Sequence, residues 1–319
     1  MISFRGSEAS RCETAHTNPR NSVGRETGCR LRLHGLSPAA LMRIDSHQHF
    51  WQYNAKRDRW ITDEMAVLKR DFLPPEFIGE MKSSGIDGSV AVQADQSEEE
   101  TSFLLRLASE YPQILGVVGW VNLCSERVAE RLAFFSQFPA IRGFRHIVQA
   151  EADEFIVRQD FDRGIRCLGE FGLTYDILVY ARQLPAAVKL VRKFPEQRFV
   201  LDHIGKPAIK DGVVDSWRNS IRAVAALPQV YCKVSGIVTE ADWKNWRAED
   251  FKPYLDTVFE SFGIDRIMFG SDWPVCLLAG SYARVKAVID DYTRELPSEA
   301  KEKIFGLNAA RFYGLGTQR

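Results

Sequence analysis

Histidines and an aspartate stand at the ends of apolar stretches in this sequence, in patterns that suit metal binding or acid–base chemistry. The segment IDSHQH carries His47 and His49 two positions apart. Residues two apart in an extended chain point to the same side, so both imidazoles would face one metal ion or one substrate oxygen. An HxH pair is a weak signal alone, but Asp45 before it and its place after the first apolar run strengthen it.

Two later segments add a third imidazole and a carboxylate. His203 follows an apolar run in the segment LDHIGKP, and Asp272 follows another in MFGSDWP. An acid directly after a fully apolar run is placed to act as a general base or a metal ligand. The alternative interpretation of Asp272 is a turn or helix-capping aspartate before a proline.

From residue 43 onward, eight strand-like runs alternate with amphipathic helical stretches. Continuous apolar runs such as SVAVQ and RFVLD are typical of parallel strands that are buried on both faces. The predicted strands are Arg43–His47, Gly88–Gln93, Ile114–Val121, Ala140–Arg145, Leu173–Leu178, Arg198–Asp202, Val230–Ser235 and Arg266–Gly270.

Strand–helix alternation repeated eight times predicts one α/β domain over residues 42–319, folded as a TIM-type (β/α)8 barrel. A doubly wound open sheet is the alternative, but the glycine-rich phosphate turn that usually marks it is absent. Active sites of such barrels lie at the carboxyl ends of the strands. His47, His49, His146 and His203 all fall at predicted strand ends, which favours one shared site over four separate structural roles.

These segments together resemble the amidohydrolase superfamily, and within it the branch of sugar lactonases and 2-pyrone-4,6-dicarboxylate lactonases. The segments GWVNL, GFRH and FGLNAARFY fit the same branch. The likeness covers residues 42–315 and implies a barrel like that of the metal-dependent hydrolases, in which Asp272 activates water as general base. It also implies that His47, His49 and His203 surround the reacting carbonyl.

The resemblance leaves the metal open. Binuclear members carry a carbamate-forming lysine at the end of strand four, where this sequence has Arg145 and His146. We therefore expect at most one zinc or other divalent ion per chain, and a metal-free site is also consistent with the branch. The ligands of a single ion would be His47, His49, His203 and Asp272.

Polar and aromatic residues near the strand ends predict how a substrate is held. Aromatic faces suit the C–H surface of a sugar ring, while basic and amide side chains hydrogen-bond its hydroxyl groups. Packing at the barrel rim is the alternative for each tryptophan, and contact with loop backbone is the alternative for His146. The predicted substrate-binding residues are Trp51, Gln93, Trp120, Arg145, His146, Lys206 and Trp273.

The sequence favours an enzyme that opens a sugar lactone, such as L-fucono-, L-rhamnono- or a related aldonolactone, to the sugar acid. A dicarboxylate would need more cationic anchors than Arg145 alone provides at the strand ends, although Lys206 and Lys233 could supply charge, so a diacid substrate is a further alternative. The alternatives are a zinc-dependent decarboxylase of the same superfamily and a catalytically inactive barrel that acts as a binding protein. The intact histidine pair, His203 and Asp272 argue against the inactive barrel.

The composition excludes several classes of partner. Lys plus Arg and Asp plus Glu number 42 each, whereas nucleic acids and anionic membranes attract a clustered positive excess. No apolar run approaches the length of about 18 residues that a membrane helix needs. The six cysteines form no CxxC pair, which favours reduced thiols in a cytoplasmic protein. A homo-oligomer is compatible with the sequence, which does not decide it.

Residues 1–41 differ from the rest of the chain. They contain six Arg, no Lys and no periodic apolar pattern, a composition that cannot offset the entropy of ordering. The apolar centre of a secretory signal is missing, and Glu8, Glu13 and Glu26 count against an organelle-targeting peptide. We expect a disordered or non-native extension, with translation beginning at Met42.

A protein that begins at Met42 should therefore keep the melting temperature and the activity of the full chain. Thermal unfolding and turnover of the two proteins, measured side by side, test this expectation. A melting temperature lower by several degrees would show that residues 1–41 stabilise the barrel.

Overall fold

The computed structural model describes residues 42–316, and its centre is an eight-stranded parallel sheet whose strands follow one another in chain order. The predicted extension over residues 1–41, with Cys12 and Cys29, lies outside the described residues. The strands are β1 (Ile44–Gln48), β2 (Gly88–Val92), β3 (Ile114–Gly119), β4 (Ile141–Ile147), β5 (Thr174–Leu178), β6 (Phe199–Leu201), β7 (Val230–Val234) and β8 (Ile267–Phe269).

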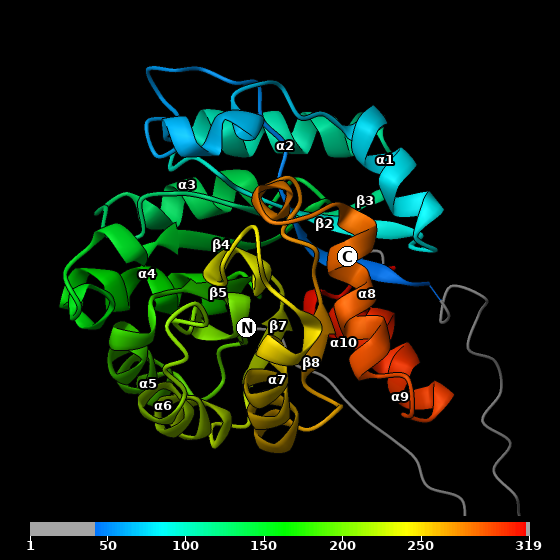
Figure 1. Ribbon diagram of the computed structural model, residues 1–319. Coiled ribbons are helices and arrows are strands. Elements are labelled where there is room, and N and C mark those ends of the chain that lie inside the picture. Colours follow the sequence, from blue (N-terminus) through cyan, green and yellow to red (C-terminus); the bar gives the residue numbers. More distant parts are fainter. Residues whose placement is uncertain (1–41, 317–319) are drawn as a thin grey trace, which may run out of the picture. The chain divides into compact units, whose positions relative to one another are not determined.

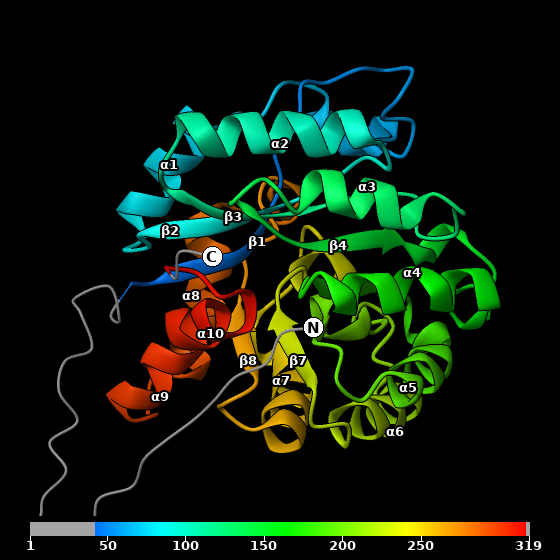
Figure 2. The same ribbon diagram turned by 180° about the vertical axis from the view of Figure 1, so that it is seen from behind.

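Helices cover the outside of this sheet, as the two opposite views in Figures 1 and 2 show. Their apolar stripes pack on the strands, which is why the strands read as continuous apolar runs. The α-helices are α1 (Pro74–Ser83), α2 (Glu98–Glu110), α3 (Val128–Phe135), α4 (Gln159–Glu170), α5 (Leu184–Lys193), α6 (Asp215–Ala225), α7 (Ala248–Phe262), α8 (Tyr282–Tyr292), α9 (Ser298–Glu302) and α10 (Asn308–Tyr313).

Backbone hydrogen bonds beyond the end of β8 close the sheet onto β1. The amide of His49 donates to the carbonyl of Trp273 at 2.7 Å, and the amide of Asp272 donates to the carbonyl of His47 at 2.8 Å. The predicted (β/α)8 barrel is therefore confirmed. All eight predicted strands are present, and their ends lie within two residues of the prediction.

The core has two layers. A large cluster lies between the sheet and the surrounding helices, and a smaller one fills the barrel interior. The smaller cluster includes Ile44, Val90 and Met268 from three strands and also Phe312 and Tyr313 from α10. The last helix thus closes the end of the barrel at which β1 begins, and the opposite end is left for the site.

Two further observations concern predicted properties of the chain. The four cysteines within the described range, Cys124, Cys167, Cys232 and Cys276, are free. Across residues 42–316, the structure contains no helix that is both long and apolar enough to cross a membrane.

Candidate active site

A register shift in β1 turns both histidines of the HxH pair towards the barrel interior. The pairing of β1 with β2 is irregular between Asp45 and Gln48. The buried carboxylate of Asp45 stabilises this stretch by accepting hydrogen bonds from the amides of His47 and Ser271 and from the Tyr282 hydroxyl. As a result the Nε2 atoms of His47 and His49 lie 3.2 Å apart.

Left-handed backbone places the other two predicted residues. His203 and Asp272 have φ angles of 53° and 59°, and Ile204 beside His203 has a φ of 48°. This conformation costs energy in non-glycine residues, most of all in a β-branched one, and such strain clusters at functional sites. The indole of the fully buried Trp217 donates to the Ile204 carbonyl at 2.9 Å and holds the turn after β6.

The structure brings His47, His49, His203 and Asp272 together. The Oδ1 atom of Asp272 lies 3.3 Å from His49 Nε2, 3.9 Å from His47 Nε2 and 4.0 Å from His203 Nε2. Each of the four residues is at most 4% exposed. One carboxylate oxygen is thus surrounded by three imidazole nitrogens at the carboxyl ends of β1, β6 and β8.

Four fully or nearly buried charged residues lie beneath this cluster, and we call them the buried ion network: Arg145, Asp176, Asp202 and Lys233. The Lys233 ammonium lies 2.6 Å from Asp176 Oδ2 and 3.0 Å from Asp202 Oδ1. The Arg145 guanidinium donates to Asp202 Oδ2 at 3.0 Å and to the carbonyl of Gln93. The network contacts His47 from both sides, because Lys233 Nζ lies 3.1 Å from its Nδ1 and Arg145 lies 3.2 Å from its Nε2.

Burial and neighbouring charges set the ionisation of the cluster. Burial holds the pKa of His47 well below its usual value and lowers that of His203 to about 4, so both rings are neutral near pH 7. Although burial acts to raise the pKa of Asp272, the three imidazoles around its carboxylate lower the pKa below its usual value. Asp272 is therefore ionised at neutral pH.

The donor atoms of this cluster fit one divalent metal ion. Nitrogen atoms of His47 and His49 and a carboxylate oxygen of Asp272 lie within 4.8 Å of one another, and two imidazoles with one carboxylate form a set that zinc takes. The Nδ1 atom of His49 is 2.7 Å from the Val92 carbonyl, to which it donates, so its Nε2 carries the free lone pair.

A cavity of about 490 Å3 opens above the cluster, and we call it the mouth cavity. His49, His203, Asp272 and Arg145 reach its floor, and Lys206, paired with Glu240, borders it. Its remaining lining is mostly aromatic and aliphatic: Trp60, Met65, Ala94, Ile147, Ala150, Leu178, Tyr180, Trp243, Val275 and Leu278, with Gln149 and Thr239 adding polar groups.

Several predicted substrate-binding residues lie elsewhere, and the predicted lining is corrected accordingly. Trp51 and Trp273 are at most 2% exposed and pack in an aromatic cluster with Phe50, Phe72 and Phe77. For both, the alternative of packing near the barrel rim is the one that the structure adopts. The described lining of the mouth cavity does not include them.

Trp120, Gln93 and His146 also lie outside the lining of the mouth cavity. The fully buried Gln93 donates to the Arg145 carbonyl, and the Trp120 indole points to His146 Nδ1 at 3.4 Å. His146 stacks on Phe155, and its Nε2 lies 3.1 Å from a Glu151 oxygen. In this structure these three residues contact neighbouring protein groups and do not belong to the cavity lining, and a role in substrate binding stays a prediction.

Sequence reasoning missed the aromatic residues that do line the cavity, and of the buried ion network it predicted only Arg145 as a site residue. Trp60, Tyr180 and Trp243 lie in loops, where no periodic pattern marks them. Asp176 and Lys233 carried a usable signal, because each is a charged residue inside an apolar strand, in TYDIL and VYCKV. A charge in such a strand is rarely buried unless it is paired.

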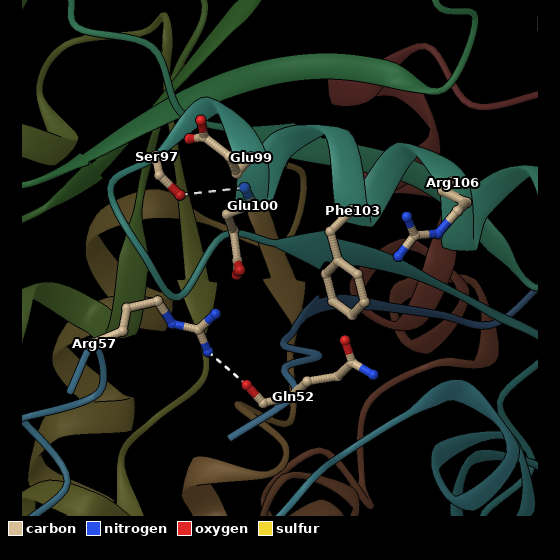
Figure 3. Close-up of a pocket in the computed structure, with 7 residues that line it drawn as sticks. All are labelled: Gln52, Arg57, Ser97, Glu99, Glu100, Phe103 and Arg106. Carbon is tan, nitrogen blue, oxygen red and sulfur yellow. Dashed lines mark hydrogen bonds between the residues drawn. The ribbon is translucent and has the colours of Figure 1, made fainter. Parts of the chain in front are cut away.

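A second cavity, of about 470 Å3, lies between the loop after β1 and helix α2 (Figure 3). The Glu100 carboxyl group points into it, while its Oε1 accepts a hydrogen bond from the Ala94 amide. Burial raises the pKa of Glu100 to about 7. This cavity contains no histidine, and of the two it is the mouth cavity that contains the predicted catalytic residues.

Comparisons with known proteins show which proteins this chain is similar to. The family described as amidohydrolase matches residues 44–315. An L-fucono-1,5-lactonase from Burkholderia multivorans is 43% identical over 86% of this chain and 96% of its own length. A second L-fucono-1,5-lactonase, from Burkholderia ambifaria, is 35% identical over 85% of this chain and 95% of its own. The crystal structure of a Burkholderia multivorans amidohydrolase with bound zinc superposes with a TM-score of 0.83 at 43% identity, over 86% of this chain and 99% of that one.

Replacing Gly236 by alanine should disturb the catalytic cluster directly. A Cβ atom there would lie 2.4 Å from His203 Nδ1 and 3.1 Å from Asp272 Oδ2, so both side chains would have to move. We expect Gly236→Ala to lower kcat at least about tenfold, since small misplacements of reacting groups are costly. Gly212→Ala is the matched control, because Gly212 also has a positive φ but has no atom within 4 Å of the added Cβ. Equal kcat values for the two variants would contradict the expectation.

Glu100 should make stability depend on pH. The pKa of a glutamate is ordinarily 4.5, and that of Glu100 in the folded protein is about 7. The folded protein therefore loses stability as the pH rises from 4.5 to about 7, by about 1.4 kcal/mol for each unit by which the pKa is raised. Glu100→Gln keeps an acceptor for the Ala94 amide and should raise the melting temperature at about pH 8 but hardly at about pH 4.5. Glu99→Gln, at an exposed position of the same helix, is the control. A Glu100→Gln effect that is the same at both pH values would refute the assignment.

Proposed function

The chain belongs to the amidohydrolase family, and on that basis we propose that it is a lactonase, a hydrolase that opens a sugar lactone to the sugar acid. The observation that carries the proposal is the mouth cavity, where an ionised carboxylate and imidazoles meet a wall of aromatic and aliphatic side chains. Its volume, about 490 Å3, is that of a small-molecule site. L-Fucono-1,5-lactone is the first candidate substrate, given the names of the two Burkholderia relatives.

In the proposed reaction Asp272 acts as the general base. Lactone hydrolysis needs an attacking water, an acceptor for its proton and stabilisation of the oxyanion that forms. Asp272 borders the cavity, and its lowered pKa keeps it in the form that accepts a proton. The neighbouring Nε2 of His49, 3.3 Å from the carboxylate, bounds the position of the water.

The groups for the carbonyl oxygen are His203 and Arg145, both of which border the mouth cavity. His203 is neutral, and its Nδ1 lies 3.0 Å from the Ser235 hydroxyl, which fixes the ring. Arg145 contributes a permanent positive charge that is held in place by Asp202. A fixed donor and a fixed charge stabilise an oxyanion without having to reorganise during the reaction.

A single zinc ion would be held by His47, His49 and Asp272, and His203 would be a further ligand only in place of its role as hydrogen-bond donor to the carbonyl oxygen. When bound, zinc supplies a Lewis acid that polarises a carbonyl and lowers the pKa of water to about 7. His47 acts in this proposal as a ligand and as the link to the buried ion network.

The lining supports a neutral sugar ring over a diacid. Trp60, Tyr180 and Trp243 offer aromatic faces to the ring. Of the cations among the described lining residues, Arg145 is assigned to the carbonyl oxygen and Lys206 is paired with Glu240, so no unpaired cation remains for an added carboxylate. Lys206 and Glu240 are instead suited to hydrogen bonds with sugar hydroxyl groups.

A panel of L-fucono-, L-rhamnono-, L-galactono- and D-arabinono-lactones, run beside a pyrone dicarboxylate in a pH-indicator assay, tests the substrate class. We expect proton release from at least one aldonolactone and none from the diacid. Carbon dioxide is measured in parallel, because its release would identify the alternative decarboxylase. Turnover of the diacid alone would overturn the proposed substrate class.

Asp272→Asn should lower kcat at least about a hundredfold, since it removes the base and keeps its shape. Asparagine also tolerates the left-handed backbone that residue 272 adopts, so the fold should remain. Turnover is measured together with circular dichroism and the melting temperature. Near-wild-type kcat in a folded variant would be incompatible with Asp272 as the base.

A further inference from the structure

His47 is the one residue of the catalytic cluster whose two ring nitrogens both face groups of the buried ion network. Nδ1 lies 3.1 Å from the Lys233 ammonium and 3.3 Å from Asp202 Oδ1. Nε2 lies 3.2 Å from the Arg145 guanidinium and 3.2 Å from His49 Nε2. Each nitrogen therefore has one cationic donor and one acceptor beside it. A doubly protonated ring would be repelled by both cations.

A neutral ring carries one hydrogen, and the two tautomers satisfy different neighbours. With the hydrogen on Nε2, His47 donates to the lone pair of His49 Nε2 and accepts at Nδ1 from Lys233. Because His49 in turn donates from Nδ1 to the Val92 carbonyl, this tautomer completes a chain of hydrogen bonds from Lys233 to Val92. With the hydrogen on Nδ1, His47 donates to Asp202 and accepts at Nε2 from Arg145.

A metal ion requires the second tautomer. To bind a cation beside His49 and Asp272, Nε2 of His47 must offer its lone pair, so the hydrogen must sit on Nδ1. The acceptor for this hydrogen is Asp202 Oδ1, which is buried 3.3 Å from His47 Nδ1 and also pairs with Lys233. Lys233 favours the tautomer with the hydrogen on Nε2, because its ammonium can only donate and therefore needs a lone pair on Nδ1.

We propose that Lys233 sets the zinc affinity of this site by determining which nitrogen of His47 carries the hydrogen. Lys233 is a positioning residue, since it acts on the ligand through His47 and does not border the mouth cavity. Lys233 stabilises the metal-free tautomer, and Asp202 stabilises the metal-binding one. The inference rests on His47 and His49 as zinc ligands and is independent of which lactone is hydrolysed.

The first measurement concerns the wild-type protein. Nitrogen-15 NMR of the metal-free chain, with His47 assigned by comparison with His47→Gln, should show a neutral ring protonated at Nε2. After zinc is added, the same ring should be protonated at Nδ1, with zinc taken up at no more than one ion per chain. A metal-free ring already protonated at Nδ1 would overturn the proposal, whatever the activity of the enzyme.

The second measurement is the zinc dissociation constant, from competition with a chromogenic chelator. Lys233→Met should tighten zinc binding at least about tenfold, the equivalent of 1.4 kcal/mol. This change leaves Asp176 and Asp202 buried without the Lys233 cation, so the single variant can fail to fold. The double variant Lys233→Met with Asp176→Asn removes one positive and one negative charge together. Its zinc dissociation constant then tests the proposal. Lys206→Met is the control for a general loss of positive charge near the site, because Lys206 does not contact His47.

Two outcomes of the second measurement count against the proposal. One is a zinc dissociation constant of the folded Lys233 variant that matches the wild type. The other is an equal gain in affinity in Lys206→Met, which would indicate a general electrostatic effect. The lactone assay is scored separately, so a protein without lactonase activity but with the expected tautomer change would refute the proposed function and leave this inference intact.

Discussion

Ions inside a protein must be neutralised there, because their removal from water costs several kcal/mol each unless a partner of opposite charge is in contact. The barrel of this chain contains two cations, Arg145 and Lys233, and two carboxylates, Asp176 and Asp202, on four successive strands or their ends. Each cation contacts a carboxylate contributed by another strand. Strands β4 to β7 therefore have to keep one relative register, and the position of His47 follows from it.

Above this layer, the catalytic groups are held by backbone more than by side-chain packing. Asp272 and His203 have left-handed backbone conformations, and a hydrogen bond to a distant residue fixes each turn. The Asp272 amide donates to the His47 carbonyl, and the Trp217 indole donates to the carbonyl of Ile204, which follows His203. Gly236 leaves the space that both side chains occupy. The strained left-handed backbone of Asp272 and His203 is thus stabilised by the hydrogen bonds that close the barrel and by the buried indole of Trp217. Such a rigid arrangement suits a site whose groups must not reorganise during a reaction.

The sequence was sufficient for the fold and for the prediction that His47, His49, His203 and Asp272 share one site at the strand ends, because both follow from strong local patterns. Continuous apolar runs marked the strands, and polar residues at their ends marked the site. The sequence was insufficient to predict which residues line the wall of the cavity. An aromatic residue near a strand end can pack in the core or line a cavity, and the fold of the neighbouring loops decides between the two. Trp51 and Trp273 pack against residues between 50 and 77, whereas Trp60 and Trp243 reach the cavity from loops without any periodic pattern. Tertiary contacts of this kind cannot be read from spacing along the chain.

Tyr313 of α10 connects the closing helix to the buried ions, since its hydroxyl donates to Asp176 at 2.7 Å from a position 137 residues later. Ribosomal synthesis delivers His47 long before Tyr313, so a nascent chain carries the interior ions before the helix that seals them exists. Until then the open end of the barrel must remain hydrated, because the charges have no complete set of partners. Final drying of the interior, and with it the ordering of the site, is therefore expected only after α10 has been synthesised and packs on the barrel.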